Sequence, residues 1–68
     1  MKVKFGVKYQ NDAGEVRAEI MDFPQIKTVA LTPNQFEMCM WFAEDGKRAG
    51  ETVVDCKPLT EYEVKRWK

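Results

Sequence analysis

Residues 2–20, KVKFGVKYQNDAGEVRAEI, decide the fold because they predict two strands joined by a turn. On both sides of the turn, apolar and polar residues alternate with a period of two, which is typical of a strand with one wet face. Residues 11–14 form the turn, since Asn, Asp and Gly tolerate positive φ. A loop of these four residues predicts a hairpin with one continuously apolar face. Its expected cross-strand pairs are Phe5 with Ile20, Val7 with Ala18, and Tyr9 with Val16.

A capped helix is expected further along the chain, over about residues 33–44. Thr32 is a suitable N-cap, Pro33 occupies the first helical position, and Gln35 completes a capping box. Gly46 is a plausible end for this helix. The residues expected to pack on the hairpin share one helical face and are Phe36, Cys39, Met40 and Ala43.

The remaining elements complete a single domain spanning residues 1–68. A bulge or the end of the strand is expected near Met21, and Pro24 ends regular pairing in the hairpin of residues 2–23 or leaves that stretch as an edge. Residues 26–30 are a candidate third strand. Another strand is expected at about 52–57. Residues 60–68 favour a short helix, capped by Thr60 and Glu63 and docked by Trp67, although their alternation also fits a strand. The fold class expected is α+β, an antiparallel sheet of three to four strands with one helix packed across it.

The composition excludes most catalytic sites. The 68 residues contain no His and no Ser, which removes Ser–His–Asp and Cys–His arrangements. Carboxylates, lysines and tyrosines would need large pKa shifts to act near neutral pH. Cys39 and Cys56 belong to no metal-binding motif, and two buried thiols are favoured over one disulfide. We therefore expect a cytoplasmic, non-enzymatic protein with no cofactor, no metal and no membrane-spanning segment.

The first candidate site lies on the helix. Its apolar residues cover roughly 220° of the circumference, whereas a helix on a small sheet needs a stripe of about 100°. Met38 and Phe42 exceed that stripe, and Trp41 lies between Glu37 and Glu44. Exposed Met and aromatic residues are typical of protein-binding surfaces and homodimer interfaces. In the alternative, the C-terminal segment covers Met38 and Phe42 while Trp41 lies along the surface.

The second candidate site is a basic face of the hairpin, formed by Lys2, Lys4, Lys8 and Arg17. The expected register sets Lys8 opposite Arg17, a like-charge pair that a nucleic acid or acidic protein would relieve. Glu15 and Glu19 on the same face, the balanced net charge and the lack of a stacking aromatic weigh against nucleic acid. The alternative is a solvated surface that discourages aggregation.

The order of a hairpin, a capped helix, Ala49-Gly50 and a short strand ending in Cys56-Lys57-Pro58 resembles the small phage-encoded inhibitors of bacterial RNA polymerase. The resemblance spans residues 44–58, and the matching residues are Ala49, Gly50, Val54 and Pro58. It implies a compact phage or mobile-element protein that covers a host protein's surface, and it assigns no binding residues. The expected function is non-catalytic protein binding to a host protein or to a second copy, with nucleic-acid binding as the alternative.

Overall fold

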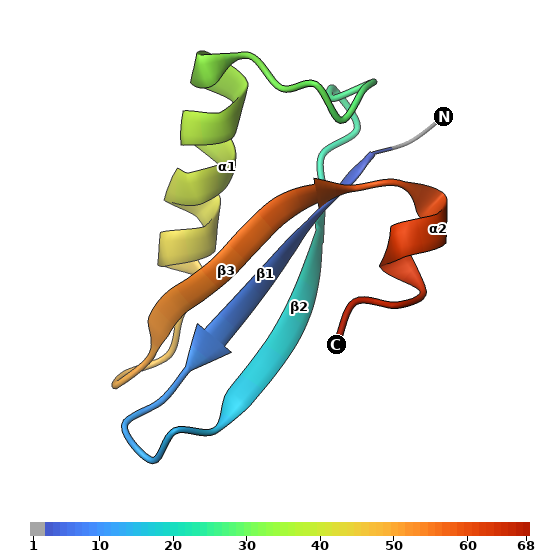
Figure 1. Cartoon of the computed structure of the whole chain (residues 1–68). Helices are drawn as coiled ribbons and strands as arrows, with labels where there is room; N and C mark the ends of the chain where they lie inside the picture. Colours follow the sequence, from blue (N-terminus) through green and yellow to red (C-terminus); the bar gives the residue numbers. More distant parts are fainter. Residues whose placement is uncertain (1–2) are drawn as a thin grey trace.

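The computed structural model describes residues 3–68 and has the predicted α+β architecture (Figure 1). Its elements are β1 (Lys4–Gln10), β2 (Val16–Asp22), α1 (Pro33–Asp45), β3 (Thr52–Leu59) and α2 (Glu61–Val64). The strands form one antiparallel sheet in the order β2-β1-β3. The helix α1 lies against one face of this sheet, and the C-terminal segment with α2 lies on the other (Figure 1).

The hairpin forms, but the predicted register is wrong by one residue. Lys8 pairs with Ala18 and Tyr9 pairs with Arg17, so the loop holds residues 11–15 instead of 11–14. The fifth loop residue is retained because Asn11 closes the loop. Its side-chain oxygen accepts hydrogen bonds from the amides of Ala13 and Glu15, at 3.0 and 2.9 Å.

This shift moves every side chain of β2 to the opposite face, since the strand period is two. Val16, Ala18 and Ile20 therefore lie on the outer face, away from α1, instead of in the core. Arg17, Glu19 and Met21 take the face that the sequence pattern had assigned to those apolar residues.

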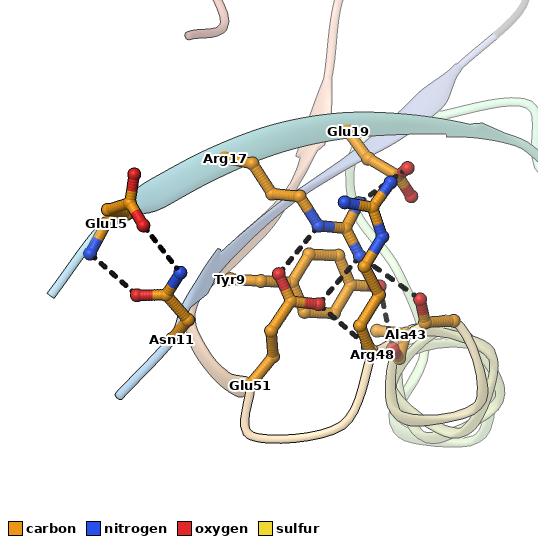
Figure 2. Close-up of polar contacts among 9 residues, drawn as sticks. Tyr9, Asn11, Glu15, Arg17, Glu19, Ala43, Arg48 and Glu51 are labelled. Carbon is orange, nitrogen blue, oxygen red and sulfur yellow. Dashed lines mark hydrogen bonds and ion pairs between the residues drawn. The ribbon is translucent and has the colours of Figure 1, made fainter. Parts of the chain in front are cut away.

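The core lies between β1 and α1. Val3 and the odd-numbered residues of β1 are buried, and these are Phe5, Val7 and Tyr9. Cys39 and Ala43 are the buried residues of α1. The Tyr9 hydroxyl donates a hydrogen bond to the carbonyl of Ala43 at 2.7 Å, which fixes the end of the helix to the central strand (Figure 2).

The predicted strand at residues 26–30 does not form. This segment makes local bonds in place of a ladder: Ile26 donates its amide hydrogen to Phe23, and Ala30 donates to the Thr28 hydroxyl. Phe23 and Ile26 are buried and complete the core. The connection between β2 and α1 is thus anchored by two side chains without joining the sheet.

Helix α1 confirms the capped helix, because Thr32 and Gln35 make both bonds of the capping box. It extends one residue beyond the prediction, to Asp45. Strand β3 continues through Pro58 to Leu59, past the predicted end at residue 57. Pro58 is tolerated there because β3 is an edge strand, paired only with β1.

The C-terminal element is helical, as favoured, but only over Glu61–Val64. Trp67 docks it: the indole N–H donates to the carbonyl of Val7 at 3.3 Å. The ring lies over Gly6, where a Cβ atom would come within 2.6 Å of Trp67 and of Leu59. Glycine is therefore required at residue 6 by close approach of these side chains.

Candidate protein-binding surface

The outer side of α1 exposes aromatic side chains. Trp41 is 64% exposed and Phe42 is 41% exposed, and their rings meet edge to face with centroids 5.0 Å apart. Trp41 lies on the side of the helix opposite Cys39 and Ala43, the two buried positions, and Phe42 lies at the border of the buried face. The narrow contact between α1 and the sheet leaves this apolar surface uncovered.

Phe42 also borders an open hollow at the end of β2. Its ring packs on Phe23 with centroids 5.6 Å apart, and the hollow has a volume of about 480 Å³. It is lined by Met21, Asp22, Phe23, Gln25 and Phe42. We call the surface made by Trp41, Phe42 and this hollow the aromatic patch.

Met38 contributes less to this surface than the sequence pattern predicts. Its side chain is half-buried against the core, and the amide of Gln25 lies 3.8 Å from its sulfur. Thus the structure brings Phe42 and Trp41 together at the surface, while Met38 packs against the core.

The C-terminal segment does not cover the aromatic patch. Trp67 packs over Gly6 and Lys8, and even-numbered β1 residues face away from α1. The sheet therefore separates Trp67 from Phe42 and Trp41, as Figure 1 shows for the two helices. The covered arrangement that the sequence left open is not the one adopted.

Acidic side chains surround Trp41. Glu37 precedes it by four residues, and Glu44 and Asp45 follow it by three and four, so all three are its neighbours on the helix surface. Glu44 makes an ion pair with Lys47 at 3.0 Å. No basic residue occurs within Pro33–Asp45. Trp41 and Phe42 therefore form an exposed aromatic pair, and Glu37, Glu44 and Asp45 form an acidic rim beside it.

Comparisons with known proteins give no relative for this chain. No family model, characterised protein or solved structure matches it.

Of the basic residues predicted to share one face, Arg17 is separated from Lys4 and Lys8. Lys8 places its ammonium 4.5 Å from the Trp67 ring centroid on the outer face, and Lys4 lies 3.6 Å from Asp22. Arg17 lies on the α1 side of the sheet instead, with its guanidinium 4.3 Å from the Tyr9 ring centroid. The expected Lys8–Arg17 pair is thus absent, and Lys2 lies outside the described residues. The outer face does carry an aromatic ring, Trp67, contrary to expectation.

Arg17 is held by a polar network that the sequence did not reveal (Figure 2). Its guanidinium donates to both carboxylate oxygens of Glu51, at 2.8 and 2.9 Å, and makes an ion pair with Glu19 at 2.6 Å. These side-chain hydrogen bonds from Arg17, helped by the backbone N–H of Arg48, lower the pKa of Glu51 from 4.5 to about 2. Arg17 and Glu51 are 34 residues apart, so no local pattern signals their contact.

Both cysteines are free thiols that pack in or against the core. Cys39 and Cys56 are both free, Cys39 being buried and Cys56 half-buried, and the Cys56 thiol lies 3.0 Å from the sulfur of Met40. Burial raises the pKa of both thiols, which disfavours the nucleophilic thiolate. Within residues 3–68, no cluster of three potential metal ligands occurs, and neither helix is long and apolar enough to cross a membrane.

Proposed function

We propose that this chain is a non-catalytic protein-binding module that uses the aromatic patch. The observation that carries the proposal is the exposure of Trp41 beside Phe42 on a face that the rest of the domain leaves open. Tryptophan and other large aromatic residues are enriched at protein interfaces, where a few such side chains supply most of the binding energy. The hollow next to Phe42 provides a place for an apolar side chain of the partner.

The acidic rim defines the chemistry of that partner. Glu37 and Asp45 flank Trp41 and make no ion pair within the described residues, so they are available to lysine or arginine. The same charges disfavour a symmetric pairing of two α1 helices, because a two-fold axis would bring like charges together. The partner is therefore a different protein that presents an apolar side chain flanked by basic residues.

The resemblance to phage-encoded polymerase inhibitors supports a host protein as the target. In this proposal the chain belongs to a phage or another mobile element, and binding inhibits or modulates the host protein by covering part of its surface. The segment that carries this resemblance, residues 44–58, begins at the end of α1, next to the aromatic patch.

Protein binding is favoured over the alternative, nucleic-acid binding. Arg17 is neutralised by Glu51 and Glu19, and Lys4 is paired with Asp22. A phosphate-binding surface needs several uncompensated cations on one face. These ion pairs leave the hairpin with too few uncompensated cations to form such a surface.

A photocrosslinking experiment tests the proposal. A photoreactive phenylalanine analogue at Trp41 is expected to give a covalent adduct with one protein in an extract of the source cells. The matched control carries the analogue at Tyr62, which is 66% exposed and lies on α2, across the sheet. The same adducts at both positions, or none at Trp41, would count against the aromatic patch.

A further inference from the structure

The two edges of the sheet differ in their readiness to accept another strand. On the β3 edge, the register shifts between Lys8 and Tyr9 and leaves Val54 as an extra residue. Pro58 further along β3 has no N–H to donate. Bulges and prolines are devices that keep edge strands from pairing. The β3 edge is therefore protected.

The β2 edge has neither a bulge nor a proline. Its seven residues, Val16–Asp22, include no proline or glycine and pair with β1 without any register shift. The strand has β1 as its single neighbour, so one row of its backbone N–H and C=O groups faces away from the sheet. A seven-residue strand offers enough length for a further antiparallel partner.

The side chains of β2 favour a partner with an apolar stripe. Val16 is 55% exposed and Ile20 is 40% exposed, and both lie with Ala18 on the outer face. This stripe exists because of the five-residue loop that shifts the hairpin register. A neighbouring strand with the same spacing of apolar residues would cover it.

A second copy of β2 has that spacing, and its charges disfavour the two registers adjacent to the one centred on Ala18. In a two-fold antiparallel pair, a residue lies on the axis and faces its own copy. With Ala18 on the axis, Val16 faces Ile20 of the partner subunit, and Arg17 faces Glu19 of the partner subunit. Placing Arg17 or Glu19 on the axis would set like charges opposite each other, which is destabilising.

We infer that two copies of this chain pair through β2 about Ala18, so that two three-stranded sheets become one sheet of six strands. Opposed residues in an antiparallel pair point to the same face. Both α1 helices consequently lie on one face of the joined sheet, and the dimer presents two aromatic patches on that face. A target with two recognition segments would gain avidity from this arrangement.

The oligomeric state and a register-specific crosslink test the inference. Sedimentation velocity across about a hundredfold range of protein concentration is expected to show conversion from monomer to dimer. Ala18→Cys is expected to give a covalent dimer under mild oxidation, because it lies next to its own copy on the axis. The matched control is Lys65→Cys, an exposed position on the segment after α2.

Two charge variants keep the inference falsifiable if the cysteine variant folds poorly. Glu19→Lys is expected to weaken the dimer about tenfold by opposing Arg17 of the partner subunit with a like charge. Glu61→Lys makes the same change of charge at an exposed position on α2 and is expected to leave dimerisation unchanged. A monomer at every concentration, equal crosslinking at residues 18 and 65, or equal effects of the two charge variants would each overturn the inference. None of these results bears on whether Trp41 binds another protein.

Discussion

Arg17 and Glu51 form a bidentate ion pair across the sheet, with guanidinium nitrogens 2.8 and 2.9 Å from the two carboxylate oxygens. Arg17 comes from β2, and Glu51 lies just before β3. The guanidinium covers the Tyr9 ring and also donates to the carbonyl of Gly46 at 3.3 Å. This pair therefore ties the edge strand to the loop that follows α1 and holds the end of the helix in place.

The ion pair predicts a specific dependence of stability on pH. The pKa of Glu51 is lowered from 4.5 to about 2 in the folded chain, so its stabilising contribution is present above pH 4.5 and is lost as the pH falls towards 2. Glu51→Gln should destabilise the protein at neutral pH, and its deficit relative to wild type should shrink through this window. Urea unfolding across the pH range measures the deficit. A deficit that stays constant down to pH 2, or one that Glu37→Gln reproduces, would contradict this assignment.

Gly6 and Trp67 are predicted to be energetically coupled. A methyl group at residue 6 collides with Trp67 and Leu59, so Gly6→Ala should destabilise the protein by about 1–3 kcal/mol through overpacking. Removing the indole relieves much of this collision. In a double-mutant cycle, Gly6→Ala should therefore cost less in a Trp67→Ala background than in the wild type. Equal costs in both backgrounds, measured by denaturant unfolding, would argue against docking of Trp67 over Gly6.

The two thiols are predicted to be unreactive in the folded protein. Burial raises the pKa of Cys39 and of Cys56, which lowers the fraction of reactive thiolate. Alkylation by iodoacetamide at pH 8, followed by mass spectrometry, should be slow for both and faster in denaturant. Because Cys39 is fully buried and Cys56 is half-buried, Cys39 should label more slowly. Rapid labelling of Cys39 without denaturant would show that α1 is not packed as described.

Nucleic-acid binding is predicted to be absent or weak. The net charge is zero, and Lys4, Lys8 and Arg17 are divided between two faces and engaged with other side chains. An electrophoretic mobility shift series with single- and double-stranded DNA and RNA should show no shift at low salt. A shift that is lost steeply as salt increases would indicate phosphate contacts and revive the alternative function.

Local signals in the sequence predicted most of the fold. The N-cap at Thr32 and the second capping box at Thr60 both form as expected, since each depends on residues within one turn. The need for Trp67 to dock the tail also followed from the shortness of α2. Contacts set by neighbouring residues are the part of a structure that one sequence reveals most directly.

The hairpin register could not be predicted because one side chain decides it. Asn11 bonds to two backbone amides of its own loop and adds a residue to the turn, which reverses the faces of β2. The Arg17–Glu51 pair depends on this reversal and joins residues 34 positions apart. Of the candidate sites, Trp41 and Phe42 meet at the surface as expected from helical spacing. The proposed basic cluster required the other register, so Arg17 lies on the opposite face of the sheet from Lys4 and Lys8.

The affinity of the two matched aromatic variants for a purified binding partner tests the central claim most directly. Once the protein crosslinked at residue 41 is purified, isothermal titration calorimetry gives its Kd for wild type, Trp41→Ala and Tyr62→Ala. Trp41→Ala should weaken binding at least about tenfold, as loss of a central aromatic contact does, and should leave the urea midpoint nearly unchanged. Tyr62→Ala, which removes an equally exposed ring beyond the sheet, should leave the Kd unaltered. Equal Kd values for wild type and Trp41→Ala would contradict a function carried by the aromatic patch.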